Sequence, residues 1–140
     1  MKILLAVDGS AYSKRMLDYL AANNGLLGTG NTFLVFTAVT SIPPHAARFV
    51  DVTTLQDHYR EQAEIVLQPI REFAAMQGWA AETAYQHGHA ADAIAEFAVD
   101  TKPDLIVMGT HGHSAWGNVV LGSVVSGVLA RSKVPVLLIR

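Results

Sequence analysis

The stretch Leu105-Ile-Val-Met-Gly-Thr-His-Gly-His-Ser-Ala-Trp-Gly-Asn-Val-Val-Leu-Gly-Ser123 decides the fold that this sequence predicts. It begins with a short apolar run, typical of a buried parallel strand, then becomes rich in glycine, and ends where a helical pattern starts. Glycine lets backbone N–H groups come close to a bound anion, and the first turn of a helix carries unpaired N–H groups and partial positive charge. This order of elements favours a phosphate site at the exit of the strand.

The rest of the chain also alternates short apolar runs with longer amphipathic patterns. Strands are expected at residues 2–7, 32–39, 83–86, 105–108 and 134–139. One helix is expected to start at Ser10 or Ser13 and to end at Asn24-Gly25. Further helices are expected at residues 54–77, with a kink at Pro69, and at 90–99 and 124–131. The alternation predicts one Rossmann-like α/β domain over residues 1–140, an open five-stranded parallel sheet with helices on both faces.

Composition excludes several classes of protein. The chain has 140 residues, no cysteine, and 10 Lys+Arg against 12 Asp+Glu, which gives a formal net charge of −2. Disulfides and thiolate chemistry are therefore excluded, and nucleic acid is a poor partner. Residues 105–130 hold no charged side chain but contain many glycine and polar residues, so no membrane span is expected. A cytoplasmic location is expected.

Two turns lie where ligands bind in such folds, outside the carboxyl ends of the strands. They are Asp8-Gly9-Ser10 and the glycine-rich segment after Met108. Neither a Gly-x4-Gly-Lys-Ser/Thr loop nor a Gly-x-Gly-x-x-Gly turn after the first strand is present, which disfavours P-loop ATPases and Rossmann dehydrogenases. The alternative for the glycines is a purely structural role in tight turns and close helix–sheet packing.

The spacing Gly109-x2-Gly112-x9-Gly122-Ser123 resembles the nucleotide-binding signature Gly-x2-Gly-x9-Gly-Ser/Thr of the universal stress protein family. The resemblance covers essentially the whole chain. Its other parts are Asp8-Gly9-Ser10-x-x-Ser13, Gly88 before a helix, Asp104-Leu-Ile-Val-Met-Gly-Thr110 and Val134-Pro-Val-Leu-Leu-Ile139. It implies one universal stress protein domain over residues 1–140, with the adenine nucleotide alpha hydrolase-like fold and strand order 3-2-1-4-5.

The resemblance also implies an ATP site. Gly109, Gly112, Gly122 and Ser123 match the family's phosphate and ribose contacts, Asp8 matches its aspartate near the adenosine, and Ala38 and Val39 match the place where the adenine is held. Val124 stands where many relatives have a second small hydroxyl residue. The full set of expected contacts is Asp8, Gly9, Ser10, Ala38, Val39, Met108, Gly109, Thr110, Gly112, His113, Gly122, Ser123 and Val124. For Asp8 a turn or capping role is the alternative to a ligand contact, and Ser123 can serve as both ligand contact and helix cap.

The expected function is a stress-response switch that binds ATP, with Mg²⁺ bridging the phosphates, and that passes nucleotide occupancy to an unidentified protein partner. No catalytic residue is expected, because no Lys or Arg lies between Asp104 and Arg131 to offset charge in phosphoryl transfer. The alternatives are a slow ATPase or nucleotide hydrolase and a nucleotide-free dimeric scaffold.

Two further features suggest other sites. The triplets His87-Gly88-His89 and His111-Gly112-His113 contain metal-ligand side chains, but in the family's strand order their strands lie three spacings, about 14 Å, apart, so no metal site is expected. The uncharged last strand, Val134 to Ile139, would form an unprotected sheet edge. A homodimer with antiparallel pairing of this strand is expected, as the family resemblance also suggests.

Overall fold

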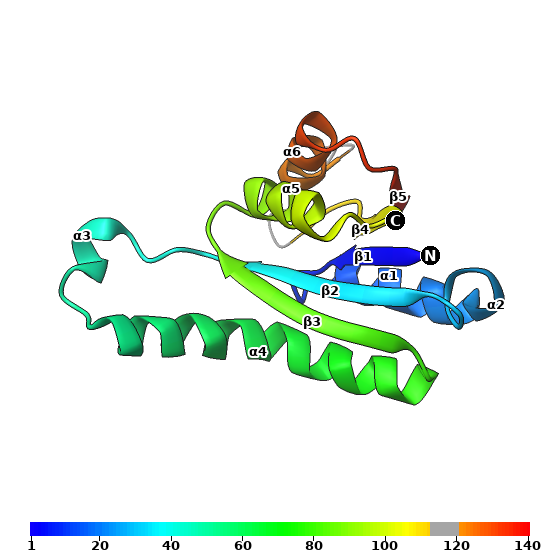
Figure 1. The fold of residues 1–140 in the computed structure, drawn as a ribbon, viewed down its shortest axis with the longest axis horizontal. Helices are drawn as coiled ribbons and strands as arrows, with labels where there is room; N and C mark the ends of the chain where they lie inside the picture. The colour runs from blue at the N-terminus through cyan, green and yellow to red at the C-terminus, as the bar shows by residue number, and fades with distance from the viewer. Residues whose placement is uncertain (113–120) are drawn as a thin grey trace.

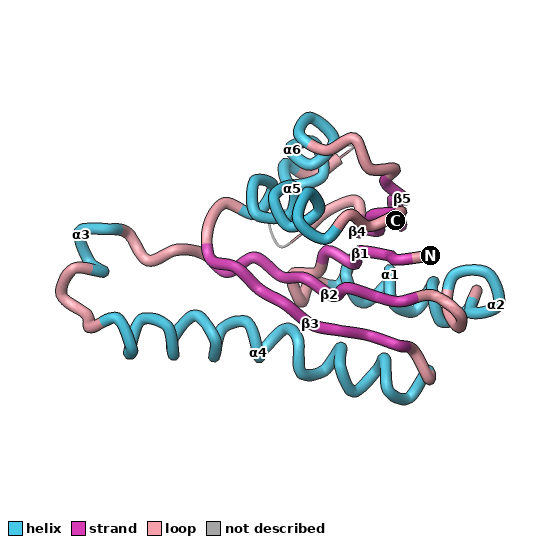
Figure 2. Tube along the Cα trace, in the orientation of Figure 1, coloured by secondary structure: helices cyan, strands magenta, loops and turns pink. Residues whose placement is uncertain are grey.

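The computed structural model describes residues 1–112 and 121–140, and in these residues the chain folds into one parallel sheet between two layers of helices (Figures 1 and 2). The sheet has five strands in the order β3-β2-β1-β4-β5, and every neighbouring pair is parallel. The strands are β1 Lys2–Ala6, β2 Thr32–Val39, β3 Ala80–His87, β4 Leu105–Gly109 and β5 Val136–Ile139. The helices are α1 Ala11–Ala22, α2 Asn24–Leu27, α3 Pro44–Ala47, α4 Val52–Gln77, α5 Ala90–Thr101 and α6 Ser123–Arg131. The predicted α/β fold and strand order are confirmed.

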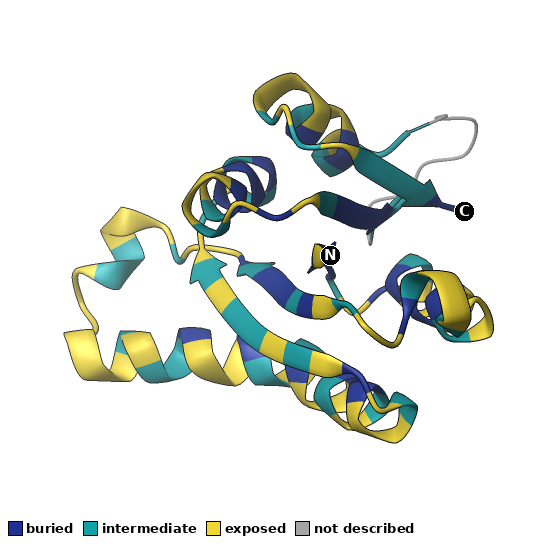
Figure 3. Ribbon diagram, turned by 45° about the vertical axis from the view of Figure 1, so that its right-hand side comes forward, coloured by how far each residue is buried: buried dark blue, intermediate teal, exposed yellow. Residues whose placement is uncertain are grey.

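The two faces of the sheet carry separate apolar cores. Ile3 and Leu5 of β1 belong to the core that includes α1 and α4, whereas Leu4 and Ala6 belong to the core that includes α5 and α6. Successive residues of a strand point to opposite faces, so a central strand covered on both sides is apolar throughout. Figure 3 shows this arrangement, with buried central strands and exposed outer faces of the helices.

Helix α1 begins because Ser10 caps it. The Ser10 hydroxyl accepts a hydrogen bond from the Ser13 N–H at 3.4 Å, which decides between the two expected caps. The expected end at Asn24-Gly25 is wrong: α1 ends at Ala22, and Asn24 begins the short helix α2. The Asn24 side chain also accepts a hydrogen bond from the Trp79 indole at 2.7 Å, so this asparagine joins α2 to the start of β3 instead of ending a helix.

Helix α4 is the longest element and lies under β2 and β3. Asp51 caps its first turn by accepting the Thr54 N–H at 2.8 Å, and Gly78 ends it in the left-handed conformation at a φ of 70°. The cap places the start two residues before the expected one. The helix continues through Pro69 to Gln77, and the kink expected there stays a prediction. Its predicted apolar face is confirmed as buried or partly buried: Leu55, Tyr59, Ala63, Val66, Leu67, Ile70, Phe73 and Ala74.

The bounds of β1, β3, β4 and β5 differ from the expected ones, those of β4 by one residue at its end. β3 is twice as long as predicted because it pairs with β2 along its whole length, from Thr32 opposite Ala80 to Val39 opposite His87. As an edge strand it alternates exposed and half-buried residues, which weakens its apolar signal. β5 begins at Val136, after Pro135, which has no N–H to donate to a ladder. β1 ends at Ala6, although the Val7 N–H still bonds to the Phe36 carbonyl at 2.9 Å.

Candidate functional site

A cavity of about 690 Å³ opens at the carboxyl ends of β1, β2 and β4, between α4 on one side and the first turns of α5 and α6 on the other. Its volume lies within the range of small-molecule sites. The described residues that line it come from widely separated parts of the chain: Ala6, Val7, Asp8, Ser13, Thr37, Ala38, Val39, Thr40, Ser41, Ile42, Pro43, His58, Gln62, Ile65, Val66, Ala90, Ile94, Met108, Gly109, His111, Gly112, Gly122, Ser123, Val124 and Val125.

The turn after β1 orients Asp8 toward this cavity. One carboxylate oxygen of Asp8 accepts the Ser10 N–H and the Ser13 hydroxyl, both at 2.9 Å, and the Asp8 N–H donates to the Ser13 hydroxyl oxygen at 3.0 Å. Gly9 adopts a φ of +76°, which allows the chain to turn here. Asp8 is therefore a turn-stabilising residue whose carboxylate also lines the cavity.

The glycines of the predicted motif form one wall, the glycine wall, which comprises Gly109, Gly112, Gly122 and the first turn of α6. A Cβ on Gly109 would lie 2.8 Å from the Tyr12 Cβ, and one on Gly112 would lie 2.4 Å from an Asp8 carboxylate oxygen. A Cβ on Gly122 would lie 3.3 Å from the Thr110 carbonyl oxygen. Each glycine permits a close approach of two segments, so the structural role considered for them is present in all three.

Helix α6 presents its N-terminus to the cavity. Gly122 caps it without a side-chain hydrogen bond, and its own N–H donates to the Thr110 carbonyl at 2.8 Å. The next three residues, Ser123, Val124 and Val125, line the cavity. Their N–H groups belong to the first helical turn, where no carbonyl of the helix itself can accept them.

Helix α5 begins at the same cavity and packs against α6. Ala90, its first residue, lines the cavity, and a Cβ on Gly127 of α6 would lie only 2.5 Å from the Ala91 Cβ. The Arg131 guanidinium pairs with Asp92 of α5 at 2.5 Å. These contacts fix the first turn of α5 against the middle and the end of α6. The N-termini of both helices border the cavity, and their partial positive charges favour an anion.

The opposite wall, the connection wall, is built from side chains. It comprises residues 40–43, which follow β2, together with the α4 residues in the lining, His58, Gln62, Ile65 and Val66. Ile42, Pro43, Ile65 and Val66 make it largely apolar, and His58 and Gln62, one helical turn apart, add an imidazole and an amide.

The predicted contacts divide into three groups. Those that line the cavity are Asp8, Ala38, Val39, Met108, Gly109, Gly112, Gly122, Ser123 and Val124. Gly9, Ser10 and Thr110 do not line it: the first two border a separate apolar groove between α1 and α4, and Thr110 is 7% exposed. The Thr110 N–H bonds to the Ile139 carbonyl at 3.0 Å and thereby joins the β4 exit to β5. His113 lies outside the described residues.

Sequence reasoning missed the α4 side of the cavity. His58, Gln62, Ile65 and Val66 lie in the middle of an amphipathic helix, where no turn or motif marks them. The available signal was the topology, because a long helix that returns from the end of β2 to the start of β3 must pass the carboxyl edge of the sheet.

The charge of the lining is nearly neutral. Among the described lining residues there is no Lys or Arg, and Asp8 is the one carboxylate. No group of three or more His, Asp or Glu side chains that would suit a metal ion occurs in residues 1–112 and 121–140. His87 and His89 lie on the β3–α5 side: His89 pairs with Asp92 at 3.2 Å, and His87 contacts Ser41.

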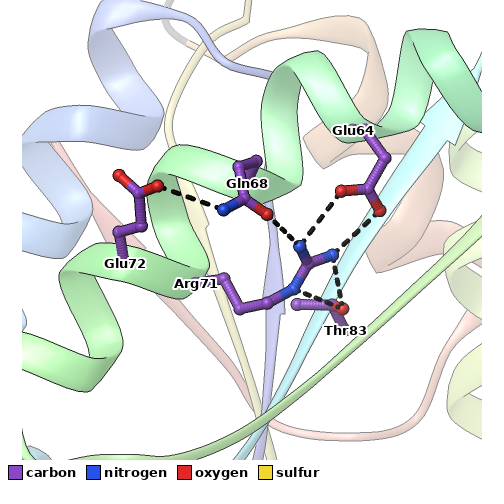
Figure 4. A network of polar contacts seen from close by, with 5 residues as sticks. All are labelled: Glu64, Gln68, Arg71, Glu72 and Thr83. Atoms are coloured by element: carbon purple, nitrogen blue, oxygen red, sulfur yellow. Dashed lines mark hydrogen bonds and ion pairs between the residues drawn. The ribbon is translucent and has the colours of Figure 1, made fainter.

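The polar network in Figure 4 joins α4 to β3 away from the cavity lining. Arg71 donates to both Glu64 carboxylate oxygens, at 3.0 and 2.9 Å, to Thr83 of β3 and to Gln68, which in turn donates to Glu72. The hydrogen bonds between Arg71 and Glu64 lower the pKa of Glu64 and raise the pKa of Arg71. The network is half exposed and anchors the helix that forms the connection wall.

The family model described as the universal stress protein family matches residues 1–140. A universal stress protein of Thermus aquaticus is 37% identical over 99% of this chain and 97% of its own length, and YxiE of Bacillus subtilis is 33% identical over 99% and 98%. Slr1230 of Synechocystis is 31% identical, but the chain spans only 42% of its length. Within the described residues no helix has the length and hydropathy needed to span a membrane.

Solved structures of universal stress proteins have the same fold as this chain. The universal stress protein UspA of Lactobacillus plantarum superposes with a TM-score of 0.81 at 22% identity, over 100% of this chain and 97% of that one. A universal stress protein in complex with cAMP gives a TM-score of 0.66 at 26% identity, over 100% and 96%. One from Archaeoglobus fulgidus in complex with dAMP gives 0.67 at 22% identity, over 100% and 98%. The likenesses at 22% identity support the fold alone.

Proposed function

We propose that this chain, which belongs to the universal stress protein family, binds ATP in the cavity at the carboxyl ends of β1, β2 and β4 and acts as a nucleotide-dependent switch in the stress response. The observation that carries the proposal is the glycine wall, where a glycine-rich strand exit and the N-terminus of α6 line a cavity large enough for a nucleotide; the first residue of α5 lines the same cavity. The solved universal stress protein that is 26% identical to this chain holds cAMP, which supports the choice of an adenine nucleotide as ligand class.

The two walls suit the two ends of a nucleotide. Apolar side chains at the end of β2 and on α4, among them Val39, Ile42 and Val66, suit a flat purine ring. The glycine wall suits phosphates, because backbone N–H groups and helix dipoles stabilise negative charge without a formal cation. We therefore place the base at the connection wall and the phosphates at the glycine wall.

A Mg²⁺ ion fits this arrangement as a companion of the phosphates. Magnesium prefers oxygen ligands and usually takes them from phosphates, water and one or two carboxylates. Asp8 supplies the one carboxylate among the described lining residues, and Ser123 supplies a hydroxyl. The ion would neutralise phosphate charge that the described lining does not offset.

The substitution Ser123→Asp tests the placement of the phosphates. Ser123 is exposed at the first position of α6, so an aspartate there leaves the packing intact and interacts favourably with the helix N-terminus. Its carboxylate would repel the phosphates, and the affinity for ATP, measured by calorimetry, is expected to fall at least about tenfold. The affinity for adenosine, which has no phosphate, is expected to stay unchanged.

Ser126→Asp is the matched control. It adds the same charge to the same helix one turn later, at an exposed residue outside the cavity lining, and should change the affinity for ATP less than about twofold. An unchanged affinity in Ser123→Asp would show that the phosphates lie elsewhere. Wild-type protein that binds no ATP by calorimetry, and that releases no nucleotide for mass spectrometry when freshly purified, would refute the proposed function itself.

Incubation with radiolabelled ATP separates binding from catalysis. The described lining offers no Lys or Arg to stabilise charge in phosphoryl transfer, so we expect retained, stoichiometric nucleotide and at most slow hydrolysis. Several turnovers per minute would favour an ATPase, and no retained nucleotide would favour a scaffold.

We further propose a cytoplasmic homodimer joined through β5. This strand lies at the end of the sheet order, and Val136, Leu137 and Leu138 are only partly buried, so antiparallel pairing with a second copy would cover an apolar edge. Leu137→Lys should convert the dimer into monomers on sizing chromatography while the circular dichroism spectrum stays that of a folded α/β protein. A folded variant that remains dimeric would mean that another surface joins the copies.

A further inference from the structure

Residues 40–43, which follow β2, all line the cavity although three of the four are exposed. An exposed connection of this kind is usually mobile, because few packing contacts restrain it. This one is tied to two elements that are distant in sequence, α4 and the end of β3. The residues that tie it are Tyr59 and His87, and neither of them lines the cavity.

The tie consists of two hydrogen bonds and one ring stack. The Ile42 N–H donates to the Tyr59 hydroxyl oxygen at 3.0 Å, and the Ser41 hydroxyl lies 3.0 Å from His87 Nδ1. The Tyr59 and His87 rings stack nearly parallel, with centroids 4.3 Å apart and planes inclined by 7°. Consecutive residues of the connection are thus held by two side chains that also hold each other.

Tyr59 makes this arrangement rigid, because it is 5% exposed and belongs to the core that α4 forms with the sheet. Its hydroxyl is therefore at a fixed position where the backbone of the connection can bind. The end of β3 is fixed as well, since the Gly88 N–H donates to the Val39 carbonyl at 2.8 Å. Both supports of the connection belong to the folded scaffold.

We infer that Tyr59 and His87 are positioning residues that hold residues 40–43 in the conformation that receives the purine base. This inference rests on the proposed function and deepens it. A wall that is ordered before the ligand arrives avoids the entropy cost of ordering it on binding. Loss of the tie should therefore weaken contacts to the base and leave contacts to the phosphates unchanged.

Tyr59→Phe tests this directly, because it removes the hydroxyl that accepts the Ile42 N–H and keeps the ring that stacks on His87. Calorimetry with ATP and with adenosine should show affinities about three- to tenfold weaker than wild type, the size expected for one lost hydrogen bond. The affinity for inorganic tripolyphosphate, which has no base, should not change. Tyr85→Phe, the same exchange at an exposed tyrosine of β3 outside the cavity lining, serves as the control and should bind all three like wild type.

A second variant is needed because Tyr59 is buried, and its substitution can also disturb the core. His87 is exposed, and His87→Phe keeps a ring for the stack but removes the nitrogen near Ser41. Like Tyr59→Phe, it should lower the affinity for ATP and for adenosine. Unchanged affinities in both variants, or an equal loss for ATP and tripolyphosphate, would overturn the positioning role while ATP binding by wild type still stands. Wild type that binds none of the three ligands would overturn the proposed function and this inference together.

Discussion

The two walls of the cavity differ in the contacts that hold them in place. The glycine wall consists of backbone that comes close because side chains are absent, as at Gly109 against Tyr12. The connection wall is an exposed stretch of chain held in place by side chains from elsewhere, such as Tyr59. A wall made of close backbone contacts has no space for an added atom, whereas a wall held by several side-chain bonds can lose one of them and keep the others.

The largest effect should come from adding one methyl group to the glycine wall. In Gly109→Ala the new Cβ would lie 2.8 Å from the Tyr12 Cβ and 3.1 Å from its backbone, so α1 must move away from β4. We expect a loss of about 1–3 kcal/mol in the free energy of unfolding, measured by urea denaturation. Gly25→Ala is the control, because nothing lies within 4 Å of the added Cβ and alanine favours the helix α2. Equal stability of the two variants would contradict the claim that the glycine wall has no space for an added atom.

Tyr59→Phe should have a smaller effect on the connection wall. It removes one of two hydrogen bonds and leaves the ring stack, so the expected change is the three- to tenfold loss in affinity for ATP given above. A loss of folding as severe as that of Gly109→Ala would mean that the connection wall is as intolerant of change as the glycine wall.

The smallest effect should be a loss of stability at acidic pH. It would arise at the start of α4, the helix that contributes to the connection wall. The N–H of Thr54 donates to Asp51 and lowers the pKa of this carboxyl, so the charged form stabilises the folded state. The contribution is present above the ordinary pKa of an aspartate, about 4, and is lost as the pH falls through the lowered value. The melting temperature of Asp51→Asn should therefore lie slightly below that of wild type at pH 7, and the gap should close toward pH 3. A gap that is constant with pH would contradict the role of this charge.

The sequence allowed good prediction of the glycine wall and poor prediction of the connection wall. Gly109, Gly112 and Gly122 come from one continuous motif, the alternation of elements predicts a parallel five-stranded sheet, and the family resemblance implies the strand order. The connection wall depends on Tyr59 and His87, which are 28 residues apart on a helix and a strand and meet only after the sheet forms. In the sequence Tyr59 is one of several apolar residues on a helix face, and His87 is part of a triplet that suggests metal binding instead of ring stacking.

The uncharged lining of the glycine wall has a consequence for the conditions under which the protein would respond. Sites that hold phosphates with lysine and arginine lose affinity as salt rises, because dissolved ions compete with and screen exposed charges. Partial charges on fixed N–H groups at the ends of α5 and α6 are screened less when a ligand covers them. Nucleotide occupancy would then follow the supply of nucleotide and change little under osmotic shock, when the concentration of ions in a cell shifts most.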